Sequence, residues 1–565
     1  MHYVCSHCQA RYDVTEEDLA FYDKVSPTIG GKKHLIPPPI ECYDCRQLRR
    51  LAMRNERNLY ARTCDLCAQH LISIYSPEKK LTVYCPTCWW GDKWSALNYG
   101  REYDFSRSFF EQFKELYSSV PKISSFTMPD NINSEYAHDG YRLKNCYLIF
   151  DGEQAQDSYY GELYGLIRDC CDFLYLKDCE LCYECMYCNK CFDLRYSRHC
   201  NNCSSSSFLL DCNSCKNCIG CTNLVQREYC IFNEPYSREE FERLKNEMKL
   251  DTASGVAAAR EKSEAFFRTQ PRRATRGYMN EDISGDNLTE CKNTHDSFDC
   301  MGMRDCRYCT NCMMGCTDCY DLDAWGDRTT LAYNSAYIGA GAQQLLCCFY
   351  VAFGAANMCY SIFCMQGGKG NLFGCDGVQK EGYCILNKQY TKEEYEALLP
   401  KVIEHMQRTG EWAQFFPIGT SPFAYNETVA QDFSPLVKEE VLARGWQWKD
   451  VKDDVHDVAK TIDASQLPDA VQDIPDDILQ WAIRCEVSGR PYKIQKAELE
   501  LYRRMGIPIP HKHFEVRHAE RIALRSPRHL WDRVCAKCGK AIRTTYGPER
   551  PEKVYCEECY LETVY

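Results

Sequence analysis

The sequence predicts a mainly β protein with short α-helices, in which one module stands at both ends of the chain and a second, cysteine-rich domain occurs twice between them. Three observations lead to this expectation: 41 cysteines among 565 residues, C-x2-C pairs near both termini, and a 21-residue period in the middle of the chain. A chain of this length exceeds one hydrophobic core and divides into several domains.

The chain begins Met1-His2-Tyr3-Val4-Cys5, without the basic and apolar stretches of a secretory signal. We therefore expect a cytoplasmic protein. Thiols stay reduced in that compartment, so closely spaced cysteine pairs indicate metal ligands before disulfides.

The first module contains four C-x2-C pairs. Two such pairs can hold one tetrahedral Zn2+, and four cysteine ligands leave no open position for chemistry. A catalytic zinc would keep an open position and usually includes histidine or carboxylate ligands. The pattern therefore predicts structural zinc at Cys5, Cys8, Cys42, Cys45 and at Cys64, Cys67, Cys85, Cys88.

The other end of the chain repeats this module. A third ligand set, Cys535, Cys538, Cys556 and Cys559, repeats the spacing of the set that begins at Cys64. Further upstream Cys485 is retained, but Ser488, His513 and Val516 stand where the first copy has Cys8, Cys42 and Cys45. One site has decayed while its neighbour is intact, which favours sequential pairing. We expect about three zinc ions, with Cys485 and His513 as a weak fourth candidate.

Residues 46–62 of the first module are predicted to form a helix that carries six arginines and one glutamate, a local charge of +5. Basic helices beside zinc ribbons can grip phosphate backbones, so the pattern suggests contact with RNA or a ribonucleoprotein. A solvated helix face, or pairing within this acidic chain, is an equal alternative. The candidate nucleic-acid-binding residues are Arg46, Arg49, Arg50, Arg54, Arg57, Arg525 and Arg528.

The cysteine-rich domains are predicted to be β-solenoids, similar to a parallel β-helix. Asp151, Asp172 and Asp193 recur with the 21-residue period, as do rows of cysteines, and a fixed period of this size is typical of stacked coils. Inward cysteines would act as small apolar side chains, and the aspartates would form ladders or turns. Ser237 and Thr391 each precede a predicted helix that caps a solenoid.

The expected order of domains follows from these repeats and from changes in composition. It is a double zinc-ribbon module with an arginine-rich helix (1–95), a helical connector (96–127), the first solenoid with its capping helix (128–250), a linker (251–285), the second solenoid with its capping helix (286–408), a connector with an acidic linker (409–477), and the degenerate second module (478–565).

Two segments of the solenoids allow other interpretations. Cys182, Cys185, Cys188 and Cys191 have the spacing of iron–sulfur ligands, although no Cys-Pro follows and other repeats hold cysteine at other phases, so a cluster is the less favoured alternative. Residues 345–365 are apolar and long enough to cross a bilayer, but they lie inside a repeat, so solenoid core is favoured over membrane.

Several motifs of the chain resemble a family of cysteine-rich zinc-ribbon proteins known from genomes of candidate-phyla bacteria. They are Leu35-Ile36-Pro37-Pro38-Pro39, Arg54-Asn55-Glu56-Arg57, Lys144-Asn145-Cys146-Tyr147-Leu148-Ile149-Phe150, Ser421-Pro422-Phe423-Ala424-Tyr425-Asn426-Glu427-Thr428 and the terminal ribbon. The resemblance spans most of the chain. It implies no activity, because none is established for that family.

The sequence contains no Walker A loop, H-E-x-x-H motif, nucleophile elbow or dinucleotide-binding glycine signature. We therefore expect a non-enzymatic zinc-binding scaffold whose modules contact RNA and whose solenoid faces contact protein. The alternatives are an iron–sulfur redox protein and a self-assembling structural protein.

Overall fold

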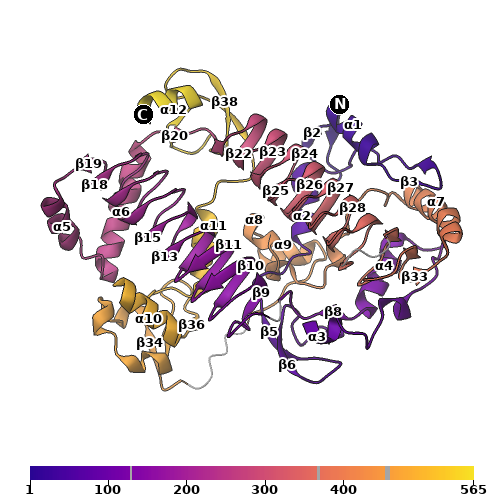
Figure 1. Ribbon diagram of the computed structural model, residues 1–565, viewed down its shortest axis with the longest axis horizontal. Helices are drawn as coiled ribbons and strands as arrows, with labels where there is room; N and C mark the ends of the chain where they lie inside the picture. The colour runs from indigo at the N-terminus through magenta and orange to yellow at the C-terminus, as the bar shows by residue number, and fades with distance from the viewer. Residues whose placement is uncertain (128–129, 366–369, 452–457, 565) are drawn as a thin grey trace.

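The computed structural model describes residues 1–127, 130–365, 370–451 and 458–564. Within them the chain is mainly β, with 12 α-helices. Two large, mostly parallel sheets lie side by side, and helices and small hairpins surround them (Figure 1). We call them the first stack (residues 137–235) and the second stack (residues 277–389).

Successive parallel strands of the first stack pair at a constant offset, so that Tyr147 lies opposite Tyr159, and Tyr159 opposite Cys171. The same separation of 12 positions joins the N–H of Cys146 to the hydroxyl of Ser134 on the neighbouring coil. The chain therefore completes one circuit over this length. The strands are β9 (Ala137–Tyr141), β10 (Tyr147–Gln156), β11 (Tyr159–Arg168), β12 (Cys171–Lys177), β13 (Glu180–Tyr183), β14 (Met186–Asn189), β15 (Phe192–Arg195), β16 (Ser204–Ser207), β17 (Lys216–Ile219), β18 (Glu228–Ile231) and the antiparallel β19 (Glu234–Pro235).

The second stack has the same design with a less constant circuit. Gly277 pairs with Leu288, Arg304 with Thr317, and Met358 with Leu372. Its strands are β21 (Gly277–Tyr278), β22 (Glu281–Thr289), β23 (Lys292–Met301), β24 (Arg304–Arg307), β25 (Thr310–Cys312), β26 (Thr317–Trp325), β27 (Thr330–Ile338), β28 (Gln343–Leu346), β29 (Phe349–Val351), β30 (Ala356–Cys359), β31 (Leu372–Phe373), β32 (Cys384–Ile385) and β33 (Lys388–Gln389).

The predicted 21-residue repeat is wrong as a coil length. Every third side chain points inward, as Cys179, Cys182 and Cys185 do, and the residue before each has a positive φ of about 50°. The unit is thus a triplet, and four triplets close a circuit. The predicted period and the observed circuit are both multiples of three residues. The recurring cysteines therefore show which of every three residues points inward. Backbone pairing, which the spacing does not report, sets the length of the circuit.

The positive-φ residues make the corners of each circuit. Asp151, Asp172 and Asp193 are three of them, with φ between 48° and 57°, so these aspartates are turn residues. Left-handed backbone is tolerated best by Gly, Asn and Asp and is costly for β-branched residues. Accordingly, none of the positive-φ residues in the described segments is Val, Ile or Thr.

The interior of the stacks explains the cysteine content. Sγ of Cys185 lies 3.4 Å from the Tyr183 carbonyl oxygen and 3.2 Å from that of Leu194, and other inward cysteines repeat this geometry. A thiol is small enough for a coil whose sides are each a single triplet, and it can donate to carbonyls of its own and the next coil. Ser197 and Ser206 occupy the same inward phase.

Helices cap the stacks as predicted, and one predicted linker is a helix. Helices α5 (Arg238–Glu247) and α7 (Lys392–Thr409) begin after Ser237 and Thr391, whose hydroxyls accept from the backbone N–H of Glu240 and Glu394. The expected linker at 251–285 contains α6 (Ala253–Thr269) and β20 (Arg272–Arg273). Helix α6 buries Val256 and Phe267, and its Arg260 pairs with Glu184 of the first stack. The apolar pattern of this helix is weak in the sequence, because its buried face also carries Ala259 and Ser263.

The end modules pack against the stacks in a crossed fashion. The first includes β1 (His2–Val4), β2 (Arg11–Asp13), α1 (Glu16–Val25), β3 (Thr28–Ile29), β4 (Lys32–Lys33), α2 (Tyr43–Leu51), β5 (Tyr60–Thr63), β6 (His70–Ser73), β7 (Val83–Tyr84) and α3 (Pro86–Trp89). Its helix α2 lies on β26 and β27 of the second stack. The connector holds η1 (Ala96–Tyr99), α4 (Phe109–Ser119) and β8 (Lys122–Ile123).

The second module repeats these elements on the first stack. It contains β35 (Trp481–Arg484), β36 (Pro491–Tyr492), α10 (Lys496–Met505), α11 (Phe514–Ala523), β37 (Trp531–Val534), β38 (Ala541–Thr544), β39 (Val554–Tyr555) and α12 (Glu557–Val564). Helix α11 lies on β11 and β12. The region between α7 and this module holds α8 (Ala430–Phe433), α9 (Lys438–Ala443), β34 (Lys460–Asp463) and several 3-10 turns, and α8 and α9 lie between the stacks (Figure 1).

The structure also tests the expected helix at 46–62 and the apolar run at 345–365. The predicted helix at 46–62 is shorter: α2 ends at Leu51, and Asn58 N–H bonds Asn55 Oδ1 in the turn that leads to β5. The apolar run 345–365 supplies β28, β29 and β30. None of the helices in the described ranges has the length and apolar character to cross a membrane.

Candidate metal centres and arginine contacts

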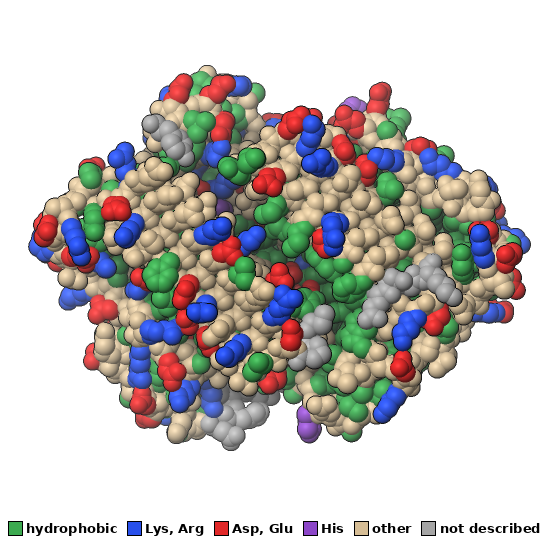
Figure 2. All heavy atoms as spheres, viewed as in Figure 1, with side chains coloured by type: hydrophobic (Ala, Val, Ile, Leu, Met, Phe, Trp, Pro, Cys, Tyr) green, Lys and Arg blue, Asp and Glu red, His purple; other side chains and the backbone are tan. Residues whose placement is uncertain are grey.

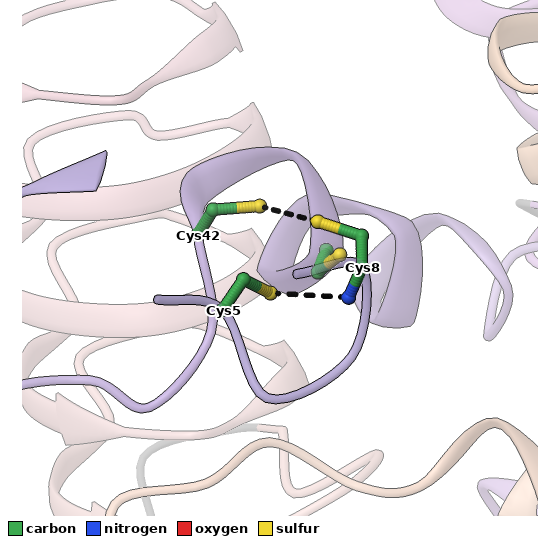
Figure 3. Close-up of side chains that lie close together, drawn as sticks. Cys5, Cys8 and Cys42 are labelled. Carbon is green, nitrogen blue, oxygen red and sulfur yellow. Dashed lines mark hydrogen bonds between the residues drawn. The ribbon is translucent and has the colours of Figure 1, made fainter. Parts of the chain in front are cut away.

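The first four-cysteine group joins a turn to the start of a helix. Cys5 and Cys8 follow β1, Cys42 is the N-cap of α2, and Cys45 lies in its first turn. Figure 3 shows the Cys8 and Cys42 sulfurs facing one another, 3.6 Å apart, with the Cys8 N–H directed at the Cys5 sulfur at 3.5 Å. The four sulfurs lie within 4.8 Å of one another.

The second and third groups share one local design. A hairpin, β5–β6 or β37–β38, carries the first pair at its turn, and the second pair begins the helix after β7 or β39. Across the two pairs, the sulfurs of Cys67 and Cys85 are 3.9 Å apart, and those of Cys538 and Cys556 are 3.7 Å apart. Each group combines neighbouring pairs, as the sequential arrangement requires.

The donor sets fit zinc. Tetrahedral ligation with Zn–S bonds of about 2.3 Å separates the sulfurs by about 3.8 Å, close to the distances between pairs in all three groups. Backbone N–H groups point at the sulfurs and favour thiolate. Burial raises the pKa of Cys535, but the N–H groups of Cys538, Cys556 and Lys537 outweigh it and lower the pKa to about 6. The chain therefore has three four-cysteine groups, each of which could hold a metal ion.

The fourth site, at Cys485 and His513, keeps the backbone turn and the helix start of the first four-cysteine group but lacks three of its cysteines. Ser488 N–H points at the Cys485 sulfur at 3.4 Å, as Cys8 N–H does at Cys5. His513 is the N-cap of α11, in the place of Cys42, and its Nδ1 accepts from Glu515 N–H. Cys485 and His513 belong to no group of three or more clustered ligands among the described residues.

The cysteine run of the first stack forms no comparable cluster. Cys182, Cys185, Cys188 and Cys191 are buried at successive inward positions, one on each side of a circuit. They are absent from the groups of mutually close ligands in the part of the chain that the structure describes. Burial raises the pKa of Cys185 well above that of a free thiol.

The arginines of α2 are buried against the second stack. Arg46 and Arg50 have side chains that are 5% and 0% exposed. Arg46 binds Asp321 at 2.9 Å, and Arg50 contacts Asp321, Asp323 and Asn334. Burial alone would lower the pKa of Arg50, but Asp323 and Asp321 raise it above its usual range. These guanidinium groups therefore neutralise carboxylates of the stack.

The second module mirrors these contacts on the first stack. Arg517 and Arg521, the equivalents of Arg46 and Arg50, both bind Asp172, with the Arg521 pair at 2.7 Å. The sequence indicated neither acid as a partner, although Asp172 belongs to the 21-residue aspartate row. Corner residues project outward from the stack. The regular spacing of aspartates in the repeats and of arginines in the helix was therefore the sequence pattern that could have indicated this pairing.

The remaining candidate arginines occupy different environments. Arg54 is 3% exposed and bonds Glu56 at 2.8 Å, Arg57 pairs with Glu515 at 3.3 Å, and Arg49 pairs with Glu41 and bonds the Phe415 carbonyl. Arg525 and Arg528 are 7% and 5% exposed and stack on Phe433. On the face drawn in Figure 2, basic and acidic side chains alternate without a continuous basic patch.

The comparisons with known proteins add little. No protein-family model matches the chain, and no curated protein matches it. A solved structure titled as a putative acetyltransferase from Desulfovibrio desulfuricans G20 aligns over 51% of this chain and 82% of its own, with 9% identity and a TM-score of 0.10. That score is too low to support an argument about fold or function.

Proposed function

We propose that the protein is a zinc-binding structural scaffold in which the end modules clamp two cysteine-cored β-solenoids. The observation that carries this proposal is the burial of Arg46 and Arg50 against Asp321 and Asp323. The same helix supplies two metal ligands, Cys42 and Cys45. A metal ion at this group would therefore fix the helix whose arginines neutralise buried acids on the outer surface of the second stack.

Structural zinc is the ion that suits these groups best. All twelve ligands are cysteines, and a closed four-thiolate site offers no coordination position to a substrate. When bound, zinc would cross-link the turn that holds one pair of cysteines to the helix start that holds the other pair. The chain's own contribution is the hairpin or helix turn that holds each pair of sulfurs in place.

The predicted contact with RNA was based in part on arginines of α2 and the turn after it, and three of these lie in buried ion pairs. Arg46, Arg50 and Arg54 could reach a phosphate backbone only by leaving buried carboxylates, and an uncompensated buried charge is costly. Our proposal therefore assigns these arginines to the architecture. The alternative that the sequence left open, pairing within the acidic chain, accounts for them.

Metal analysis of the purified protein tests this proposal. We expect a colourless protein with three zinc ions per chain, one for each four-cysteine group. Cys45→Ser should lower the zinc content to two. Cys218→Ser is the matched control, because the position one circuit earlier already carries Ser206, whose hydroxyl accepts from Cys218 N–H at 3.0 Å. Iron with visible absorption, or a Cys45→Ser protein that retains three zinc ions, would contradict the proposal.

A further inference from the structure

A cavity of about 890 Å³ lies where the two end modules approach one another. Its lining comes from the first metal group, from α2, from the segment around α8 and from the end of α11. This size is within the range of small-molecule sites. None of the contacts that support the scaffold explains why two arginines, Arg525 and Arg528, line it.

These two arginines are buried but poorly satisfied. Among the residues that the structure describes, no hydrogen-bond partner lies near the three nitrogens of Arg528 or near Nη2 of Arg525. The one carboxylate within 4 Å of either guanidinium in the described structure is Asp299, at 3.7 Å from Arg525 and 3.8 Å from Arg528, too far for hydrogen bonds. Asp44 and Asp432 also line the cavity, but neither forms an ion pair with Arg525 or Arg528 among the described residues. A buried cation without hydrogen bonds is costly, so such a pair is retained where a ligand completes it.

Comparison of the two modules shows why these arginines are left without close partners. Arg54 and Arg57 are the equivalents of Arg525 and Arg528, and both are satisfied, by Glu56 and Glu515. In the second copy Pro527 replaces Glu56. Asp44, the counterpart of Glu515, has a shorter side chain, and no ion pair joins it to Arg528 in the described part of the chain. The second copy has therefore lost one of the two carboxylates, and the other is shortened to an aspartate, while both arginines are kept.

The surroundings favour a ligand with one anionic end and an apolar part. Both guanidinium groups stack on Phe433. The Cζ atom of Arg528 lies 3.9 Å from the centroid of the ring, and that of Arg525 lies 4.4 Å from it. The hydroxyl residues Ser434 and Ser526 also line the cavity, and Leu48, Leu51 and Ile522 supply apolar wall. Stacking on an aromatic ring orients guanidinium groups for two-point recognition of an oxyanion.

We propose that Arg525 and Arg528 bind the phosphate group of a small phosphorylated molecule in this cavity. Two guanidinium groups match the charge of a phosphate monoester, about −2 at neutral pH, better than the single charge of a carboxylate. The site goes beyond the scaffold role, because it adds a ligand to the junction between modules.

Calorimetric titration of the zinc-loaded, full-length protein with inorganic phosphate tests the site. We expect one binding event, weakened at least about tenfold by Arg528→Met, and unchanged in Arg243→Met, a control at an exposed arginine on α5. Phosphate should raise the thermal midpoint of the wild type and leave that of Arg528→Met unmoved. Without phosphate, the variant should be at least as stable as the wild type, since it removes an unpaired buried charge.

Three results would overturn the proposal: no heat with millimolar phosphate, equal affinity for acetate, or binding that Arg528→Met leaves intact. Hydrogen exchange of the wild type gives a test that needs no variant. Added phosphate should slow exchange in residues 522–530, and exchange that stays the same in this segment would also count against the site. A loss of zinc in the control titrations would bear on the scaffold proposal alone.

Discussion

Replacing Arg50 by methionine should destabilise the junction between α2 and the second stack by about 3 kcal/mol. Removal of one partner from a buried ion pair costs about 3–5 kcal/mol, because a buried charge is left uncompensated. The lower end applies here. Asp321 keeps Arg46, and Asp323 keeps Gln47 at 3.0 Å and the Thr310 hydroxyl. Methionine conserves much of the side-chain volume, so a cavity contributes little.

Urea unfolding followed by hydrogen exchange of residues 43–51 measures this loss. The control is Arg243→Met, which removes an arginine that is 55% exposed and pairs with two glutamates on its own helix. Exposed pairs contribute about 0–1 kcal/mol, so the control should stay within that range. If Arg50→Met is as stable as the control, the buried guanidinium groups do not hold the module in place, and the reasoning fails.

Three further perturbations have defined outcomes. Asp172→Asn should free both Arg517 and Arg521 and cost about 3–5 kcal/mol, seen as faster exchange in α11, whereas unchanged exchange would refute the pairing. At the corner residue Asp193, with φ of 48°, a Val substitution should cost about 1–2 kcal/mol more than a Gly substitution in thermal unfolding, and equal effects would argue against the corner role. Burial lowers the pKa of His138 to about 4, below its unfolded value of about 6.5. Since the unfolded state then binds the extra proton, this histidine's contribution is full above pH 6.5 and falls by about 2 kcal/mol at pH 5. His138→Gln should flatten that part of the stability–pH curve, and an unchanged slope would contradict the assignment.

The metal groups were the most predictable part of the molecule. C-x2-C spacing depends only on a local turn, so the three four-cysteine groups and their combination of neighbouring pairs followed from the sequence. The decay at Ser488 and Val516 gave the pairing without any structure. Local signals also gave the N-caps Ser237 and Thr391, because a cap hydroxyl bonds a backbone N–H in the first turn of its own helix.

Long-range contacts were less predictable. Arg50 and Asp323 are 273 residues apart, and charge patterning alone could not choose between a solvated helix, a nucleic acid and a carboxylate of the same chain. The length of the circuit was missed for a related reason. The types of side chain show that every third residue points inward. The number of triplets in one circuit depends instead on the backbone angles at corner residues such as Asp172 and Asp193.

Hydrogen exchange before and after zinc removal tests the central claim most directly. If metal groups hold the modules whose arginines clamp the stacks, chelation should abolish protection in α2 and weaken it in β26 and β27, where α2 lies. Protection at the buried centre of the first stack, residues 180–195, should persist, because its hydrogen bonds run between coils. Unchanged protection of α2 in protein shown to be free of zinc would contradict the account.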